Sequence, residues 1–284
     1  MANRRASLIV AAAALGLVVV GLTAAGVAPP TTVRIPMTEP GPEGKHLTIE
    51  ATLYRPAGDG RHPILLFNHG STGRGAVDAT TTMRPSILAP FFVTRGFAVL
   101  APMRRGRGAS QGVHAEQEGA CQAALLDPGF ARALEDVDAA VAYVRIQPWA
   151  DPDRLLVGGQ SRGGILSVAY ASKRPELIQA VINFAGGWTS DGCDRYGPSF
   201  NEATFAAAGR LAHVPMLWLY ADNDRYYLAE SIRRYHQAFT QAGGAATFHL
   251  FPAFGADGHR LVDRVELWGA AVDDFLRQLN LVPR

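Results

Sequence analysis

The sequence predicts a single α/β domain whose central sheet is mainly parallel. The chain has 284 residues, and 48% of them are hydrophobic, which is enough to bury a large core. Several continuous apolar runs have the composition of strands that are buried on both faces. Segments with helical spacing separate these runs, and strands that alternate with helices form a parallel sheet with helices on both faces.

The first 28 residues are typical of a secretory signal peptide or a membrane anchor. Two arginines precede an uncharged apolar run, Leu8–Leu22, and small residues suitable for cleavage follow at 23–25. The uncharged stretch continues to about Val33, which is long enough for an uncleaved anchor to cross a bilayer. We therefore expect export, to the periplasm or the medium, or attachment to the membrane through residues 1–28 alone.

Residues 29–44 are rich in proline and glycine and predict an extended arm, and residues 45–284 predict one folded domain. The first strand of the domain alternates apolar with polar residues at 46–54 and is expected to be antiparallel. Later strands are expected at 62–70, 97–103, 153–159, 178–187, 214–222 and 246–251, and helices at 86–96, 130–146, 164–175, 226–241 and 261–279. Because ligands bind at the carboxyl ends of parallel strands, the residues that follow each strand are the candidates for a functional site.

A glycine-rich turn, Gly159-Gln160-Ser161-Arg162-Gly163, matches the pattern G-x-S-x-G between an expected strand and an expected helix. A nucleophile elbow requires that context. Ser161 would occupy a strained turn that exposes its hydroxyl, and side chains at Gly159 and Gly163 would collide with the adjacent strand and helix. The N–H of Arg162, at the start of the helix, is available to bind an oxyanion. A phosphate-binding loop is excluded because the pattern G-K-[ST] is absent.

A serine nucleophile needs a base and an acid, which follow an elbow in the chain order Ser, Asp, His. The loop Asp257-Gly258-His259 lies just before the last expected helix, where His259 can reach the serine. Two acids, Asp222 and Asp224, lie at the end of the strand at 214–222, and their spacing alone leaves both open.

The loop Asn68–Thr72 follows an apolar strand and is expected to supply a second oxyanion donor. The backbone N–H of Ser71 is the first choice, and that of Thr72 is the alternative. His69 is expected to brace this loop, because the base is already assigned to His259.

Together these segments resemble the α/β-hydrolase superfamily and, within it, the dienelactone-hydrolase-related group that has no large cap domain. The similarity covers roughly residues 45–280 and rests on the segments FNHGS, APMRRGRGASQG, DPDRLLVGGQSRGG, LWLYADND and DGHRLV. It implies an α/β-hydrolase fold. It also favours Asp224 as the acid, because the family's acid closes a G-x-x-D turn and Ala221 stands at the glycine position. Dienelactone hydrolases proper use a cysteine nucleophile, so Ser161 directs the expectation toward ordinary esters.

Two long connections, called excursions below, follow the strands at 97–103 and 178–187. They carry the two cysteines of the chain, Cys121 and Cys193. Both excursions emerge at the carboxyl edge of the expected sheet, and an exported chain meets an oxidising compartment. We therefore expect a Cys121–Cys193 disulfide beside the active site rather than two unrelated thiols.

Four aromatic residues are candidates for lining a substrate pocket, although packing of loops over the core explains them equally well: Trp188, Tyr196, Tyr226 and Tyr227. The Arg162 side chain has two interpretations, binding a carboxylate of the substrate or bracing loops, and bracing is the commoner role. The same two interpretations apply to Arg104, Arg105 and Arg107 in a neighbouring loop.

The expected function is that of an exported serine esterase, with a small-molecule ester as its substrate. A peptidase or an acyltransferase would use the same triad, and a non-catalytic binding protein is the least favoured alternative because all three triad residues are present. A net charge of +2 with scattered basic residues leaves no nucleic-acid footprint. No His, Cys or Glu spacing indicates a metal site, and no cofactor is expected.

Overall fold

The computed structural model describes residues 28–41, 44–71, 80–116, 120–196 and 199–282, with the backbone alone at 194–196. The expected signal peptide or anchor, residues 1–28, therefore lies outside the described residues except for its last position. Thr72, the alternative oxyanion donor, also lies outside them. No helix in the described ranges is long and apolar enough to cross a membrane.

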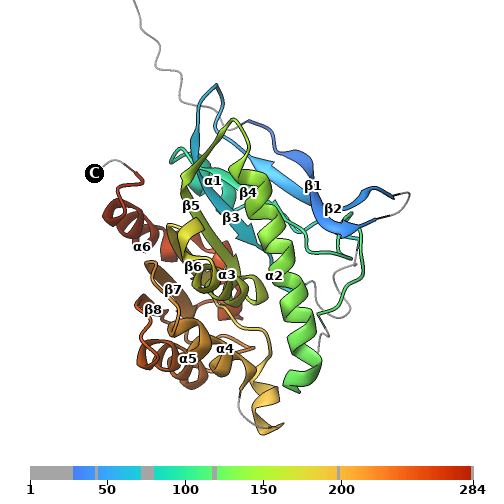
Figure 1. Cartoon of the computed structure of the whole chain (residues 1–284). Coiled ribbons are helices and arrows are strands. Elements are labelled where there is room, and N and C mark those ends of the chain that lie inside the picture. Colours follow the sequence, from blue (N-terminus) through green and yellow to red (C-terminus); the bar gives the residue numbers. More distant parts are fainter. Residues whose placement is uncertain (1–27, 42–43, 72–79, 117–119, 197–198, 283–284) are drawn as a thin grey trace, which may run out of the picture.

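Within these ranges eight strands form one sheet in the order β1-β2-β4-β3-β5-β6-β7-β8 (Figure 1). β1 pairs antiparallel with β2, β2 pairs antiparallel with β4, and the other neighbours are parallel. The mainly parallel sheet with an antiparallel start is confirmed. The bounds of β1 to β8, in chain order, are Thr31–Pro40, His46–Tyr54, His62–Asn68, Ala98–Pro102, Ala150–Gln160, Ala180–Phe184, Met216–Ala221 and Ala246–Phe251. The expectation of an arm outside the domain at 29–44 was wrong, because β1 in this stretch pairs with β2 as the edge strand of the sheet.

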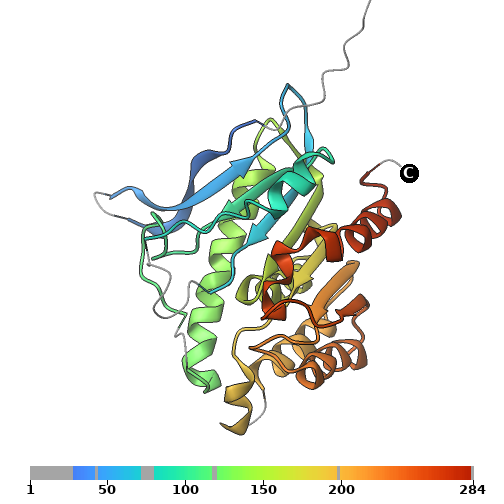
Figure 2. The same cartoon turned by 180° about the vertical axis from the view of Figure 1, so that it is seen from behind.

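Helices cover both faces of the sheet, as Figures 1 and 2 show from opposite sides. One face carries α1 (Leu88–Val93) and α6 (Val265–Gln278). The other carries α2 (Ala123–Arg145), α3 (Arg162–Lys173), α4 (Phe200–Gly209) and α5 (Ala229–Gln241). The 3-10 helices η2 (Pro175–Leu177), η3 (Asp191–Tyr196) and η4 (Gly258–Asp263) lie in the connections.

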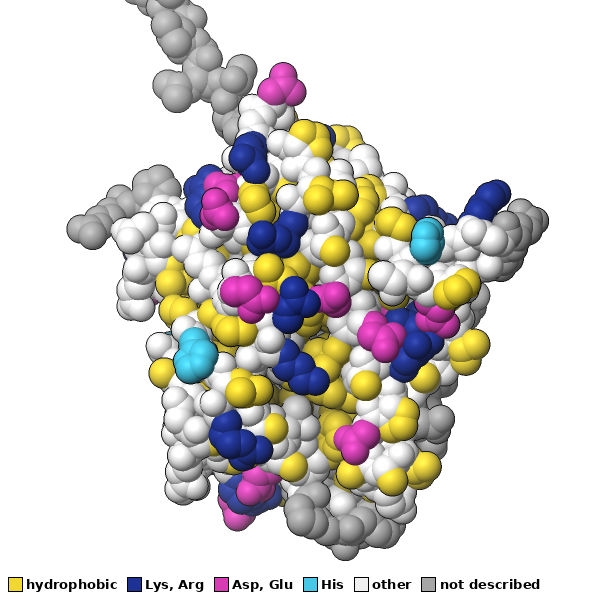
Figure 3. Space-filling model, in the orientation of Figure 1, with side chains coloured by type: hydrophobic (Ala, Val, Ile, Leu, Met, Phe, Trp, Pro, Cys, Tyr) yellow, Lys and Arg dark blue, Asp and Glu magenta, His cyan; other side chains and the backbone are white. Residues whose placement is uncertain are grey.

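Each face of the sheet has its own hydrophobic core. The apolar strands contribute side chains to both cores, because successive side chains of a strand point to opposite faces. On β5, Leu155 and Val157 join the core under α2 to α5, and Leu156 joins the core under α1 and α6. Continuous apolar runs are therefore buried on both faces, as predicted. On the face drawn in Figure 3, acidic and basic side chains are interspersed.

Two helices differ from the sequence-based expectation. α2 begins at Ala123 rather than at 130, so Pro128 and Gly129 lie inside it. A Cβ at Gly129 would lie 2.2 Å from the carbonyl oxygen of Ala115, so close packing against a neighbouring loop accounts for this glycine in the helix. The second difference is α4, which was not predicted, although Ser199 accepts from the N–H of Glu202 in the S-x-x-E pattern of a helix start.

Candidate active site

Ser161 lies between the end of β5 and the start of α3, with φ 56° and ψ −122°. A positive φ is unfavourable for a residue that has a Cβ, so the surroundings must hold this conformation. The Ser161 N–H donates to the carbonyl of Phe184 on β6 at 2.9 Å. Its carbonyl accepts from the N–H groups of Gly164 and Gly187 at 2.9 and 3.1 Å. The strained turn that the G-x-S-x-G pattern predicts is therefore present and anchored to β6.

The glycines around Ser161 allow contacts that side chains would prevent. A Cβ at Gly163 would lie 1.9 Å from the carbonyl oxygen of Asn68 at the end of β3, and one at Gly159 would lie 2.4 Å from the carbonyl carbon of Gly163. The predicted collision with a strand and a helix is thus confirmed. Since Gly163 lies against the end of β3, the same contact also brings the Asn68–Ser71 loop beside the elbow.

His259 in η4 forms a hydrogen bond through Nδ1 with Oδ2 of Asp224, at 2.8 Å. Both side chains are buried, with 7% of His259 and 4% of Asp224 exposed. The other oxygen of Asp224 accepts from the N–H groups of Tyr226 and Tyr227 at 2.7 and 3.1 Å. Asp222 is exposed. Of the two acids that the sequence left open, the structure pairs Asp224 with His259.

Two residues that sequence reasoning did not identify join the acid loop to the histidine loop. Asn223 donates through Nδ2 to the carbonyl of Phe254 at 2.9 Å, and its own carbonyl accepts from the N–H of Gly258 at 3.0 Å. Asp257 accepts through Oδ1 from the N–H groups of Arg225 and His259 at 3.2 and 3.0 Å. These bonds fix the separation of the Asp224 and His259 backbones. The Asp257 side chain capping η4 is a pattern that the sequence carries, whereas nothing local marks Asn223.

The loop that holds Ser71 is braced by His69 and Arg104. The Arg104 guanidinium donates to the carbonyls of His69 and Gly70 at 2.7 and 3.1 Å. His69 contacts the Gly70 carbonyl through Nδ1 at 2.6 Å and accepts from the Arg104 N–H through Nε2 at 3.1 Å. Burial, reinforced by the charge of Arg104, lowers the pKa of His69 to about 3. A neutral imidazole with both nitrogens engaged braces the loop, as expected, and has no free nitrogen to act as a base.

Arg104 and Arg162 share one buried carboxylate, that of Glu116. Arg104 donates to Glu116 Oε1, and Arg162 Nη1 lies 3.0 Å from Glu116 Oε2. Burial by itself would raise the pKa of Glu116, but the two guanidiniums outweigh it and hold the pKa well below its usual range. The carboxylate therefore stays charged and links the Ser71 loop to the start of α3.

The Arg162 side chain completes its contacts at the second excursion. Its Nε donates to the carbonyl of Trp188 at 3.1 Å, and its guanidinium lies 4.6 Å from the centre of the Trp188 ring. Arg105 similarly pairs with Asp136, with Arg105 Nε 2.6 Å from Asp136 Oδ1. Bracing, the commoner of the two roles considered for Arg162 and for Arg104 and Arg105, is the one observed.

A cavity of about 920 Å³ opens beside Ser161, and the sequence-predicted site residues other than Asp224 line it. Its lining includes Ser71, Ser161, Arg162, His259 and, from the pocket candidates, Trp188 and Tyr226. Trp188 is nearly buried, and 51% of Tyr226 is exposed at the mouth. Within the described ranges, no group of His, Cys, Asp and Glu residues has the arrangement of a metal site.

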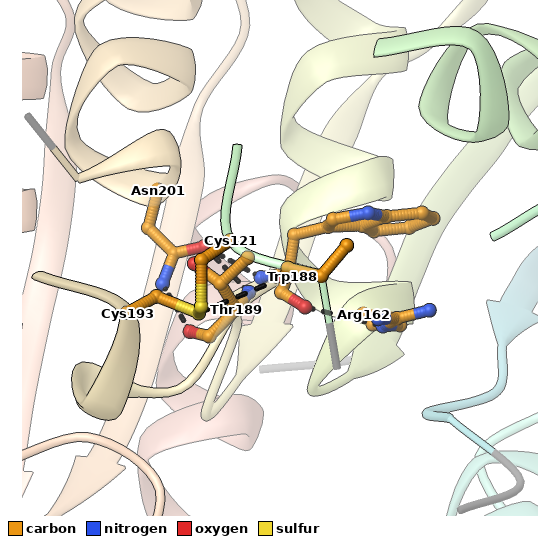
Figure 4. Close-up of a disulfide and its surroundings, with 7 residues drawn as sticks. Cys121, Arg162, Trp188, Thr189, Cys193 and Asn201 are labelled. Atoms are coloured by element: carbon orange, nitrogen blue, oxygen red, sulfur yellow. Dashed lines mark hydrogen bonds between the residues drawn. A yellow bond between two sulfur atoms is a disulfide. The ribbon is translucent and has the colours of Figure 1, made fainter. Parts of the chain in front are cut away.

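The expected disulfide joins Cys121 to Cys193, and both residues line the cavity (Figure 4). Next to it, the amide of Asn201 on α4 accepts from the N–H groups of Trp188 and Thr189 at 2.6 and 3.1 Å. Asn201 also donates to the carbonyl of Thr189 at 2.7 Å. The second excursion is thus held by a crosslink on one side and by an unpredicted helix on the other.

A model of the dienelactone hydrolase family matches residues 50–280 of the chain. The chain belongs to the dienelactone hydrolase family. It is therefore a hydrolase of that family, and its α/β-hydrolase fold and family resemblance are as the sequence predicted.

This family member is 32% identical over 150 residues to the quorum-quenching protein AidA of Acinetobacter baumannii (strain MDR-ZJ06). The match covers 52% of the chain and 44% of AidA, so it includes less than half of that relative. The fold is similar to that of acetyl xylan esterase 1 from Thermoanaerobacterium sp. JW/SL YS485, with a TM-score of 0.58, 17% identity, and 89% of each chain covered. It is also similar to dipeptidyl peptidase 4 of Porphyromonas gingivalis, with a TM-score of 0.61 and 15% identity, over 90% of this chain and 36% of the peptidase.

Proposed function

We propose that this hydrolase is an exported serine esterase that cleaves carboxylic esters through an acyl-enzyme. Ser161 is the nucleophile, His259 the general base and Asp224 the residue that orients the imidazole. The observation that carries the proposal is the 2.8 Å bond between His259 Nδ1 and Asp224 Oδ2 in the cavity that Ser161 also lines. With Nδ1 engaged by the acid, Nε2 remains for the serine hydroxyl.

In the proposed reaction, His259 takes the proton of Ser161 while Oγ attacks the carbonyl carbon of the ester. The N–H groups of Ser71 and Arg162 stabilise the oxyanion, since Arg162 is the first residue of α3 and has no helical carbonyl to bind. The alcohol leaves with the proton from His259, and water then releases the acid by the same steps in reverse order. A serine nucleophile favours ordinary esters, and a lactone is the cyclic case of the same bond.

The test is an S161A variant assayed on p-nitrophenyl acetate. We expect kcat to fall on the order of 10⁶-fold, because the nucleophile is lost. Ser190 is an exposed serine in the same cavity, so S190A is a matched control that should keep both activity and labelling by a fluorophosphonate probe. An S161A variant that still hydrolyses the ester would disprove the assignment, and failure of the parent protein to label would identify a non-catalytic protein.

Export is supported by the pattern of residues 1–28 and by the Cys121–Cys193 bond, since disulfides persist in oxidising compartments. Fractionation of cells that express the full chain, followed by N-terminal sequencing, tests both export and cleavage. Recovery of the intact chain from the cytoplasm would contradict the proposal.

A further inference from the structure

Tyr227 lies three residues after Asp224 and contacts two members of the proposed triad with atoms other than its hydroxyl. Its N–H donates to Asp224 Oδ1 at 3.1 Å. Its ring meets the imidazole of His259 edge-on, with the ring centres 5.4 Å apart. Only 3% of the residue is exposed. The phenol is therefore held in one place by the acid and the base.

The hydroxyl of Tyr227 lies at the glycine that anchors the elbow. A Cβ at Gly187 would lie 2.6 Å from this oxygen and 2.4 Å from Cζ, so only glycine leaves room for the ring. The N–H of Gly187 donates to the carbonyl of Ser161 at 3.1 Å. Tyr227 and Ser161 line the same cavity. The phenol hydroxyl therefore lies beside the turn that carries the reacting atom of the proposed mechanism.

We propose that Tyr227 is a further catalytic residue, whose hydroxyl donates a hydrogen bond to Ser161 Oγ and stabilises Oγ as it leaves the acyl group. The inference rests on the proposed function. The sequence indicated Tyr227 only as one of four aromatic candidates for lining the pocket, and gave it no role in catalysis.

The proton balance of the reaction is unchanged by this group. In acylation the proton of Oγ goes to His259 and then to the leaving alcohol. In deacylation a proton of water goes to His259, the carbon–Oγ bond breaks, and Oγ takes that proton back. Burial raises the pKa of Tyr227, although the Ser161 side chain and Arg162 oppose the rise, so the phenol keeps its own proton throughout. Its hydrogen bond is strongest when Oγ carries most negative charge, which occurs as the carbon–Oγ bond breaks.

A Y227F variant removes the hydroxyl and keeps the ring. With p-nitrophenyl acetate, whose leaving group makes deacylation limiting, we expect kcat to fall about 10- to 100-fold, as for loss of a hydrogen bond to a charged group. A burst of one equivalent of nitrophenol should precede the slow turnover, because acylation remains fast. Y170F is the matched control, since Tyr170 is a buried tyrosine on α3 whose hydroxyl donates to Asp138 at 2.8 Å, away from the residues that line the cavity. Its kcat should stay within about twofold of the parent.

A Y227F variant with an unchanged melting temperature and a kcat within about threefold of the parent would overturn the inference. So would an equal loss in Y170F, or a loss of the burst with deacylation unaffected. If S161A is inactive while Y227F turns over at the parental rate, only the role of Tyr227 fails. If S161A stays active, the proposed function itself fails.

Discussion

The two sides of the cavity are held by different kinds of contact. On the side of Ser161, backbone hydrogen bonds and glycine contacts tie the ends of β5, β6 and β7 together, and the side chains of Asn223 and Asp257 add contacts between the last two loops. The excursions are instead held by contacts between side chains or from a side chain to the backbone. These contacts are the ion pairs of Glu116, the Cys121–Cys193 disulfide and the hydrogen bonds of the Asn201 amide. Backbone contacts at strand ends are set by the sheet, whereas each side-chain contact depends on one residue. Changes on the first side should therefore affect kcat, and changes on the second should affect stability and substrate range.

The largest effect is expected at the acid. D224N keeps the shape of the side chain but removes the charge that orients His259, so kcat should fall about 10⁴-fold with little change in KM. D222N is the control, because Asp222 is exposed two residues away, and it should behave as the parent. Steady-state kinetics on p-nitrophenyl acetate decides between them, and a larger loss in D222N would contradict the pairing seen here.

On the opposite wall, E116Q should be the most damaging single change. It leaves the buried guanidiniums of Arg104 and Arg162 without their counter-charge, which costs roughly 3–5 kcal/mol of unfolding free energy. E135Q is a matched control, because Glu135 pairs with Arg105 at a carboxylate that is 54% exposed and should contribute at most about 1 kcal/mol. Urea unfolding followed by circular dichroism measures both, and equal midpoints for the two variants would show that the cluster is not stabilising.

Removal of the disulfide by the double substitution C121S and C193S should cost about 2–4 kcal/mol of unfolding free energy. The crosslink spans a sequence separation of 72 residues and lies in the cavity wall. We expect the KM for esters with bulky acyl groups to change more than the KM for p-nitrophenyl acetate. The kcat for p-nitrophenyl acetate should be unchanged, since other contacts hold the triad. Parallel kinetics on the two substrates test this. A fall in kcat for p-nitrophenyl acetate in a folded variant would contradict the expectation that changes at the excursions leave catalysis intact.

The last effect is a pH dependence of stability at His69, which is small for any single pH unit. Its pKa is lowered to about 3 in the folded protein, against about 6.5 when unfolded. Between these values the unfolded chain binds more protons, so the unfolding free energy falls as the pH falls, by at most about 1.4 kcal/mol per pH unit from this residue. H69N should flatten the profile of unfolding free energy between pH 6.5 and 4, and H46N, at an exposed histidine, should leave it unchanged. Identical slopes for both variants would exclude His69 as the source.

Much of the fold could be predicted because its signals are local. Continuous apolar runs marked the buried strands, and a strand, glycine-rich turn and helix marked the elbow at Ser161. The start of α2 was missed because Pro128 and Gly129 disfavour helix in isolation, and the packing of Gly129 against Ala115 lies outside any local window. α4 carried a local signal at Ser199 that was not used.

The sequence by itself determined the class of sheet, the strained serine, the position of His259 after the last strand and the two cysteines that pair. The family resemblance favoured Asp224 over Asp222, but only the tertiary structure pairs Asp224 with His259, because two acids in one turn differ in which of them faces the His259 loop. It also decided that Arg162 binds Glu116, and that Tyr227 lies against Gly187 and His259. Burial and backbone geometry leave periodic patterns in a chain, whereas pairing between side chains of distant loops depends on how the loops dock.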